Sequence, residues 1–448
     1  MAKFLTLLEN IISGFLPFSL LIFIGIYLSF KSRFLQFSGL LKSFSLIKKA
    51  VMQKKTDSNS FSSFQAATTA LSAAVGTGNI VGVSSALILG GPGAIFWMWL
   101  SSFMGMLIKY AEITLGIKYK ENEKGGPMYY IQKAIPKKFK PIGYLFSLLL
   151  LPTVIISGNI TQTAVAVEAF GLKGLYSLII VVFFAALCYL SLKKGIAGIG
   201  RITEKLVPFM SVGYIIICLI VILANRNKIP NALTSVLIGA FSPKSVTGGV
   251  VASTATAMFT GASRGVFSNE AGLGTSAIAH SRAFDADLKT QGLFGIFEVF
   301  IDTTLLCTLT ALTILVSGVK IEYGSNSAFC LVSSAFATVF KESSNVILCF
   351  MLCCFSLSSV IGWAVYGKAA LEHLKADRLN KIFDTFYPLC SIVAIFLNSS
   401  SALRLSSILN GALLICNLPA ILYLSEEFIY KKEKKYDTKQ NKSFKNTT

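Results

Sequence analysis

Charged side chains are scarce in this sequence of 448 residues. Asp, Glu, Lys and Arg make up 14% of it, whereas soluble domains typically carry about 25%. Acidic residues are the scarcest, with 21 Asp and Glu against 41 Lys and Arg, and 54% of the chain is hydrophobic. Because so few polar side chains could not cover a soluble core, the composition excludes a soluble protein and predicts an integral membrane protein.

Histidine is almost absent, with only His280 and His373, and the nine cysteines are scattered through apolar segments without metal-ligand spacing. Catalysis inside a membrane would require a Ser–His arrangement or a metal cluster. Both histidines are expected at cytoplasmic helix ends. The sequence therefore predicts neither an enzyme nor an organic cofactor.

The formal net charge of +20 could suggest a nucleic-acid partner. The Lys and Arg residues, however, form short clusters between long apolar runs, which is typical of the cytoplasmic loops of multi-pass membrane proteins. We therefore expect a lipid bilayer and no nucleic acid as the chain's surroundings, and we expect a monomer.

Eleven runs of about twenty apolar residues predict membrane-spanning helices. If the N-terminus lies outside, cytoplasmic segments hold 31 of the 41 Lys and Arg, and outside segments and span edges hold eight. The positive-inside rule therefore predicts an outside N-terminus and a cytoplasmic C-terminus in the cell (inner) membrane. The predicted spans are 11–30, 64–88, 93–116, 141–165, 174–192, 204–224, 248–280, 290–317, 345–365, 383–398 and 404–424.

Two of these spans carry polar, glycine-rich interruptions, at 76–79 in the second and within 264–274 in the seventh. Glycine weakens a helix by about 1 kcal/mol relative to alanine. Each interrupted span begins a set of five, and five spans reverse the direction of the chain. Paired broken helices in an inverted repeat are typical of secondary transporters, in which half-helix ends bind the cargo.

The chain then divides into four parts. Residues 1–60 hold an extra N-terminal transmembrane helix and a basic cytoplasmic loop, 61–225 the first five-helix repeat, 226–425 the second, inverted repeat, and 426–448 a basic cytoplasmic tail.

The two interrupted spans and their neighbours resemble the alanine/glycine:cation symporter family, which is related in fold to LeuT. The resemblance extends over about residues 60 to 425. It includes Val-Gly-Thr-Gly-Asn-Ile at 75–80, the ten-residue run at 90–99 and the eleven-residue run at 264–274. The resemblance implies an all-α polytopic membrane protein with eleven transmembrane helices, in a LeuT-like 5+5 inverted repeat with two broken helices plus one extra N-terminal helix.

The resemblance also implies a substrate site between the breaks at 76–79 and 267–269. The substrate carboxylate would bind backbone N–H groups of the first break and the Gln162 side-chain amide, and its ammonium would meet backbone carbonyls. Trp363 and Phe267 would limit the side-chain pocket to a small residue. The implied substrate-binding residues are Ala74, Gly76, Thr77, Gly78, Asn79, Gln162, Phe267, Ser268, Asn269 and Trp363.

A sodium ion would serve as the coupling ion in this family. The matching positions are the carbonyls of Ser72 and Val75 and the hydroxyls of Ser358 and Ser359. Oxygen ligands of this kind suit a hard cation.

These observations predict a sodium-coupled symporter that carries alanine or glycine into the cell by alternating access. The alternative is a proton-coupled amino-acid carrier that uses Glu298, Asp302 or Glu270 as the proton acceptor. Glu298 and Asp302 are four residues apart and so share one helix face, where they could instead form a buried network with Arg264. Glu270 would cap the half-helix that follows the second break.

Two further charged residues, Lys109 and Glu112, lie near the predicted cytoplasmic end of the third span. We expect them to pair or to extend toward the membrane surface.

Overall fold

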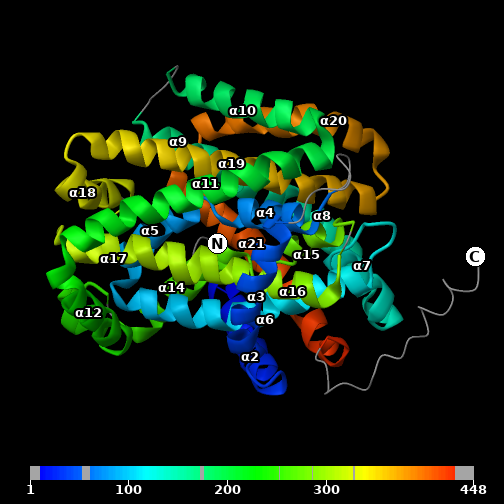
Figure 1. Ribbon diagram of the computed structural model, residues 1–448, viewed down its shortest axis with the longest axis horizontal. Helices are drawn as coiled ribbons and strands as arrows, with labels where there is room; N and C mark the ends of the chain where they lie inside the picture. The colour runs from blue at the N-terminus through cyan, green and yellow to red at the C-terminus, as the bar shows by residue number, and fades with distance from the viewer. Residues whose placement is uncertain are drawn as a thin grey trace, which may run out of the picture.

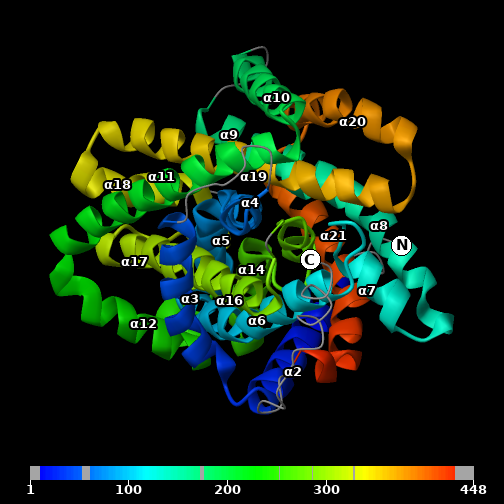
Figure 2. The same cartoon turned by 45° about the vertical axis from the view of Figure 1, so that its right-hand side comes forward.

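The computed structural model describes residues 11–52, 61–171, 176–251, 253–284, 286–325 and 328–428. Within these ranges the chain is helical, and the only β-type pairing is an isolated bridge between Glu121 and Lys124. The predicted basic tail lies outside the described residues beyond Phe428. Figures 1 and 2 show the helices as one bundle, with α4, α5, α14 and α15 in its interior.

Among the described residues, seven helical stretches are long and apolar enough to cross a membrane, and each corresponds to a predicted span. They are Ile12–Lys31, Gly93–Lys118, Lys137–Ala169, Gly195–Ala224, Leu288–Ser317, Ser343–His373 and Ser399–Tyr423. The labelled helices within them are α2 (Leu16–Lys31), α6 (Gly93–Lys118), α8 (Pro141–Thr153), α9 (Thr161–Ala169), α11 (Gly195–Ala224), α16 (Leu288–Val299), α17 (Thr308–Ser317), α19 (Ser343–His373) and α21 (Ser399–Tyr423).

The other four predicted spans fall on shorter or interrupted helices. Span 64–88 is α4 (Ser63–Ala74), a 3-10 turn η2 (Thr77–Asn79) and α5 (Val81–Gly90). Span 248–280 is α14 (Thr254–Asn269) and α15 (Thr275–Ser281). Span 174–192 is α10 (Ser177–Lys193), and span 383–398 is α20 (Asp377–Leu389) with η8 (Cys390–Ile395).

Several helices lie in segments that the sequence analysis treated as loops. Helix α3 (Leu35–Met52) occupies most of the predicted cytoplasmic loop and packs against α16. The short apolar stretches α12 (Ile229–Phe241), α13 (Pro243–Thr247) and α18 (Ala328–Phe340) lie between predicted spans, and α7 (Pro127–Ala134) precedes α8. The helices α7, α12, α13 and α18 are too short to span a bilayer. A search for apolar runs of about twenty residues therefore does not detect them.

Local sequence explains where the first interrupted helix begins and ends. Ser62 and Gln65 form a reciprocal capping box at its start, because the Ser62 side chain accepts from the Gln65 N–H and the Gln65 side chain accepts from the Ser62 N–H. After Ala74 the backbone becomes extended at Val75 and Gly76. The α-helical ladder therefore stops in the middle of the molecule.

Helix α6 supports both interrupted helices, since it packs against α5 of the first and against α14 and α15 of the second. Gly261 makes one of these contacts possible. A Cβ atom at this position would lie 2.0 Å from the Ala94 carbonyl oxygen, so only glycine allows α14 to approach α6 so closely.

Among the described residues, three spans contain π-helical turns, η1 (Ile11–Phe15), η4 (Val154–Ile160) and η7 (Phe300–Cys307). Such turns are common at functional sites. Here η4 directly precedes Gln162, and η7 contains Asp302. The Glu298–Asp302 spacing therefore crosses from an α-helix into a π-helix, and the predicted shared helix face is not maintained.

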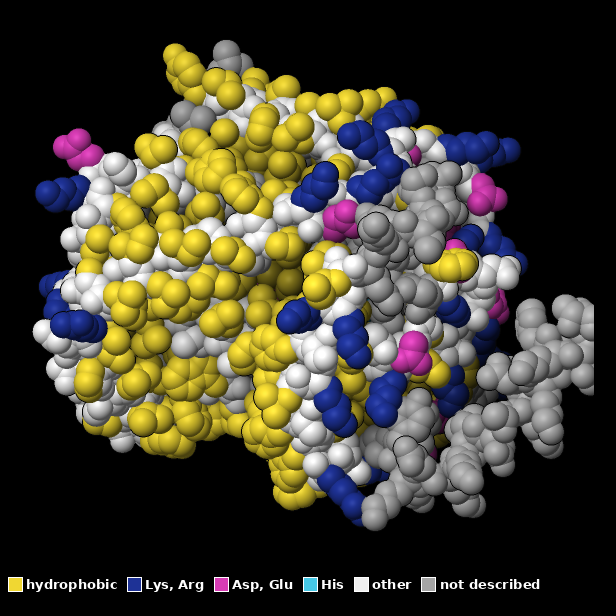
Figure 3. All heavy atoms as spheres, in the orientation of Figure 1, with side chains coloured by type: hydrophobic (Ala, Val, Ile, Leu, Met, Phe, Trp, Pro, Cys, Tyr) yellow, Lys and Arg dark blue, Asp and Glu magenta, His cyan; other side chains and the backbone are white. Residues whose placement is uncertain are grey.

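The surface agrees with a multi-pass membrane protein. Hydrophobic side chains cover a broad area in Figure 3, and Lys and Arg side chains gather on the right-hand side, where α7 lies in Figure 1. Only a few charged side chains lie at the opposite, left-hand edge, where α12 and α18 are found.

Candidate functional site

The first break is present where the sequence analysis placed it. Gly76 has φ −144° and ψ −152°, and Thr77, Gly78 and Asn79 form a single 3-10 turn before α5 begins. The Gly76 N–H donates to Asn79 Oδ1 at 3.0 Å, and the Thr77 N–H donates to Gln162 Oε1 at 3.0 Å. Two of the predicted carboxylate-binding amides are thus exposed by the unwinding and have side-chain partners in this conformation.

The second break lies a few residues later than predicted. Helix α14 continues through Phe267, Ser268 and Asn269, and the unwound residues are 270–274. The helix ends here because Glu270, Gly272 and Gly274 have positive φ, which glycine adopts readily. Residues 267–269 contain no glycine and stay helical. The prediction of an unwound segment at 267–269 is therefore wrong, although these residues form the end of the half-helix.

Asp302 joins the two interrupted helices. From the first break, Asn79 Nδ2 donates to Asp302 Oδ1 at 2.8 Å and to its carbonyl oxygen at 2.9 Å. From the end of α14, Ser268 Oγ donates to Asp302 Oδ2 at 2.7 Å, and the neighbouring Thr303 hydroxyl donates to the same oxygen at 2.7 Å. All four side chains are buried. The carboxylate accepts three side-chain hydrogen bonds, which occupy both of its oxygens.

Asn269 and Glu270, at the start of the second break, bond to the residues around it. Asn269 Nδ2 donates to the Thr303 hydroxyl at 3.1 Å, and Asn269 Oδ1 accepts from the Ala271 N–H at 2.9 Å. Glu270 Oε2 accepts from the hydroxyl of Thr275, the first residue of α15, at 2.6 Å. Glu270 thus contacts the start of α15 as predicted. The donor is the Thr275 hydroxyl, however, and not a backbone N–H.

Trp363 lies against the first break from α19. Its Nε1–H donates to the Ala73 carbonyl at 3.2 Å, and a Cβ atom at Gly158 would lie 2.4 Å from Trp363 Cβ. Phe267 lies against Gly78, where a Cβ would be 3.2 Å from the Phe267 ring. The two predicted wall residues therefore contact opposite ends of the same segment, 73–78.

Two of the four predicted sodium ligands, Val75 and Ser359, meet at the end of α4. Ser359 Oγ donates to the carbonyls of Ala73 and Val75, both at 3.2 Å, and a Cβ at Gly362 would lie 2.4 Å from Ser72 Oγ. Ser358 has a buried hydroxyl oxygen without a hydrogen-bond partner among the described residues. Buried hydroxyls are rarely left unsatisfied, so this oxygen fits a cation ligand.

The second carboxylate of the predicted pair, Glu298, belongs to a different network. Glu298 Oε1 lies 2.6 Å from His280 Nε2, and Glu298 Oε2 lies 3.9 Å from Lys109 Nζ. His280 also bonds to Gln291. Neither Glu298 nor Asp302 has Arg264 as a hydrogen-bond or ion-pair partner among the described residues, so the predicted network with Arg264 is not formed.

Lys109 is fully buried, and its ammonium donates to the Asn269 carbonyl at 2.6 Å. It therefore pairs inside the bundle and does not extend toward the surface. A cation at this carbonyl also complements the C-terminal end of the α14 dipole.

The sequence analysis missed one residue that holds the second break. Asn417 on α21 donates from Nδ2 to the Gly272 carbonyl at 2.8 Å and to Glu112 Oε1 at 2.7 Å, and it also bonds to Tyr130. Asn417 lies in the middle of an apolar run. This position could have identified it as a candidate, because polar residues in spanning helices are usually functional or bonded.

Two interrupted helices with exposed N–H and carbonyl groups, joined at a buried carboxylate, form a site that can bind a zwitterion and a cation inside a membrane. Among solved structures, MhsT in complex with L-phenylalanine is similar to this chain with a TM-score of 0.57 over 82% of this chain and 96% of that one, at 15% identity. This likeness shows a LeuT-like fold. The fold defines the class as multi-pass helical membrane proteins with a LeuT-like architecture.

Sequence comparisons identify the family. The Sodium:alanine symporter family matches residues 1–448, so the chain belongs to this family. AgcS of Methanococcus maripaludis, named a sodium/alanine symporter, is 34% identical over 438 residues, covering 93% of this chain and 94% of that protein. "Probable sodium/glutamine symporter GlnT" of Bacillus subtilis is 30% identical over 417 residues, covering 91% and 85%. The chain is therefore a multi-pass amino-acid symporter and not an enzyme.

Proposed function

We propose that this protein imports a small neutral amino acid, alanine or glycine, together with sodium by alternating access. The observation that carries the proposal is the bonding of Asn79 and Ser268 to one carboxylate, Asp302, which brings the two helix interruptions together. The name of the relative AgcS supports alanine and sodium, and the name of GlnT shows that related chains differ in substrate.

The proposed substrate site uses residues 74–79, Gln162 and the end of α14. The substrate carboxylate would accept from the N–H groups of Gly76, Thr77 and Gly78. It would replace Asn79 Oδ1 and Gln162 Oε1, which accept from Gly76 and Thr77 in this conformation. Its ammonium would meet the carbonyls near Ala74 and the last turn of α14. Ser268, Asn269, Phe267 and Trp363 would complete the site.

The proposed sodium site lies beside it. The Ser359 hydroxyl already donates to the Val75 carbonyl at 3.2 Å. The Ser358 hydroxyl oxygen has no hydrogen-bond partner among the described residues and would be the further ligand. Ala73 replaces Ser72 as the carbonyl that faces Ser359. Because the same segment offers carbonyls to the ion and amides to the substrate, binding of one would favour binding of the other.

The proposed topology has eleven spans, with the N-terminus outside and the C-terminus in the cytoplasm of the cell membrane. The repeats would comprise 61–225 and 226–425, and the chain would work as a monomer. The concentration of Lys and Arg at one side of the molecule supports this orientation (Figure 3).

Proton coupling is the second candidate function. One contact favours it: His280 and Glu298 are both buried and 2.6 Å apart, which suits a site that exchanges protons. Asp302 and Glu270, in contrast, already accept bonds from hydroxyl or amide donors.

Uptake of labelled alanine into proteoliposomes distinguishes the two candidates. We expect an imposed sodium gradient to drive accumulation when the proton gradient is collapsed with an uncoupler. Accumulation driven by a proton gradient in sodium-free buffer would instead establish the second candidate, and Glu298→Gln should then abolish it.

A further inference from the structure

A cavity of about 620 Å³ lies beside the helix that follows the first interruption and the half-helix that precedes the second. It is lined by α5, which begins two residues after Asn79, and by the turn of α14 that carries Arg264, three residues before Phe267. The start of α21, the end of α9, residues 13–15 of the N-terminal span and residues 325 and 328 at the start of α18 complete it. Its volume is typical of small-molecule binding sites, which measure about 300–1,000 Å³.

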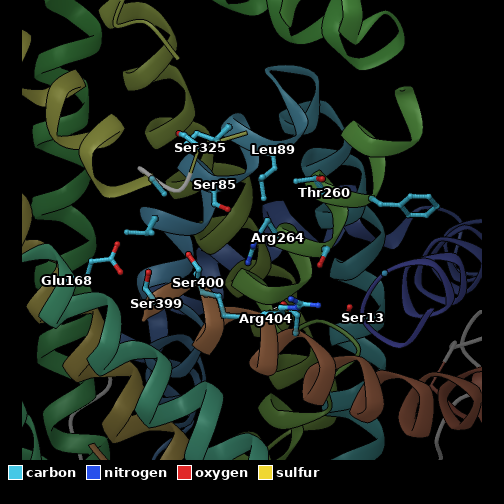
Figure 4. A pocket seen from close by; sticks show the side chains of 18 of the residues that line it. Ser13, Ser85, Leu89, Glu168, Thr260, Arg264, Ser325, Ser399, Ser400 and Arg404 are labelled. Carbon is cyan, nitrogen blue, oxygen red and sulfur yellow. Dashed lines mark hydrogen bonds between the residues drawn. The ribbon is translucent and has the colours of Figure 1, made fainter. Parts of the chain in front are cut away.

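The lining is polar and carries both signs of charge. Hydroxyl side chains such as Ser85, Ser263 and Ser400 predominate, with two arginines and a single acidic residue, Glu168. Figure 4 shows Arg264 and Arg404 extending into the cavity from α14 and α21, with Glu168 on the other side of it. Glu168, Ser400 and Arg404 are exposed, so the cavity is open to solvent. On the orientation proposed above, it opens to the outside.

Arg264 is the residue that requires an explanation. Its Nη1 is buried and has no hydrogen-bond partner among the described residues. Leaving a buried polar nitrogen without a hydrogen-bond partner destabilises the folded protein, and more so when the group carries charge. Such a group is normally paired, and a guanidinium fits a carboxylate with two parallel hydrogen bonds.

We propose that this cavity is a second, outer binding site for the zwitterionic amino acid. Arg264 and Arg404 would hold its carboxylate, and Glu168 with the surrounding hydroxyls would hold its ammonium. The inference rests on the proposed function, because it takes the transported amino acid as the ligand. It adds a site at which the substrate waits before it enters the region between the breaks.

The position of the cavity explains how such a site would receive the amino acid before it reaches the first break. In this conformation the Gly76 and Thr77 N–H groups are bonded to Asn79 and Gln162. An arriving carboxylate therefore meets Arg264, whose Nη1 has no hydrogen-bond partner among the described residues, before it reaches the Gly76 and Thr77 amides. Phe267, one turn further along α14, lies against Gly78 between the cavity and the first break.

Sodium-driven uptake and equilibrium binding of labelled alanine test the proposal with the full chain in proteoliposomes and nanodiscs. We expect Arg264→Gln to raise the KM for alanine about tenfold while kcat stays within about twofold, with Arg264→Lys in between. The matched control is Arg226→Gln, an exposed arginine outside the cavity, which should leave KM unchanged. Glu168→Gln should raise KM in the same way and provides the test if Arg264→Gln does not fold.

Binding without sodium separates this proposal from the proposed function. The wild type and Gln162→Ala should both retain weak alanine binding in sodium-free buffer, and Arg264→Gln should lose it. An unchanged KM in both variants, or a fall in kcat alone, would overturn the outer site while leaving sodium-driven uptake intact. Replacing chloride by gluconate should not alter the KM of the wild type for alanine. If uptake by the wild type requires chloride and uptake by Arg264→Gln does not, the cavity binds an inorganic anion and the proposal is overturned. If wild-type uptake itself does not depend on sodium, the proposed function fails, and sodium-free binding still tests the outer site.

Discussion

Asn79 and Asp302, which are 223 residues apart in the sequence, are joined by two hydrogen bonds of 2.8 and 2.9 Å from one amide nitrogen. Asn79 ends the turn of the first break, and Asp302 lies in the π-helical turn of a span that belongs to the other half of the chain. The same carboxylate accepts a bond from Ser268 at the end of α14. A single side chain, Asp302, is therefore bonded to both interrupted helices.

Replacing Asp302 by Asn tests this connection. An amide offers one oxygen in place of two, so a buried hydroxyl of Ser268 or Thr303 loses its acceptor, at a cost of about 1–3 kcal/mol. We expect a lower thermal stability of the purified protein and a loss of at least tenfold in alanine affinity, since about 1.4 kcal/mol corresponds to tenfold. Thr303→Ala removes one donor and keeps the charge, so its effect should be smaller. Normal alanine affinity in a folded Asp302→Asn protein would contradict the connection.

Gln162 is the side chain that already contacts the first break, through the Thr77 N–H. Hydrogen bonds to a charged group contribute about 1.5–3 kcal/mol. Gln162→Ala should therefore weaken alanine binding by about 10- to 100-fold in an equilibrium binding assay. Gln132→Ala, on α7 and outside the site, is the control. Equal affinities of Gln162→Ala and the wild type would remove Gln162 from the substrate site.

Much of this architecture could be predicted from the sequence, because hydropathy and glycine placement are local signals. All seven long apolar helices and the break at Gly76 fall where the pattern places them. The second break was placed too early because the polar residues Ser268 and Asn269 precede the glycines that unwind the chain. Polarity alone does not end a helix, whereas a positive φ does.

The pairing of buried charges could not be predicted, because it depends on which helices meet. Glu298 and Asp302 are four residues apart, yet one bonds to His280 and the other to Asn79. A π-helical turn changes the direction of the side chains between them, and such a turn has no clear sequence signature. The contact of Asn417 with Gly272 is likewise fixed only by tertiary packing.

Trp363 is expected to limit the size of the substrate. It is buried, and its ring nitrogen bonds to Ala73 at the edge of the first break. Trp363→Ala should lower alanine affinity and allow uptake of larger amino acids, which competition against labelled alanine would measure. Loss of alanine uptake without any gain of larger substrates would indicate a packing role for this residue.

Gly158 provides a second route to the same residue. A methyl group at this position would come within 2.4 Å of Trp363 Cβ, so Gly158→Ala should displace the indole and reduce alanine uptake at least tenfold. Gly82→Ala is the matched control in the helix after the first break, since a Cβ there has nothing within 4 Å. If both alanine variants transport normally, the contact between η4 and Trp363 has no part in transport.

The two serines proposed as sodium ligands differ in one respect that can be tested. Ser359 bonds to the carbonyls of Ala73 and Val75, whereas the Ser358 hydroxyl oxygen is buried without a partner among the described residues. Removing an unsatisfied hydroxyl relieves a cost of about 1–3 kcal/mol, so Ser358→Ala should make the sodium-free protein more stable to heat or leave it unchanged. Ser359→Ala should make the sodium-free protein less stable.

Sodium should reverse this order for Ser358→Ala. A ligand that binds only the folded state stabilises it by RT ln(1 + [L]/Kd), so the loss of one oxygen ligand should reduce the rise in melting temperature that sodium produces. The variant should also need more sodium for half-maximal uptake, and its alanine affinity should return close to wild type at saturating sodium, because the two sites are coupled and not identical. Potassium in place of sodium controls for ionic strength. A wild-type sodium response in Ser358→Ala, or a defect in alanine affinity that saturating sodium does not relieve, would place the ion elsewhere.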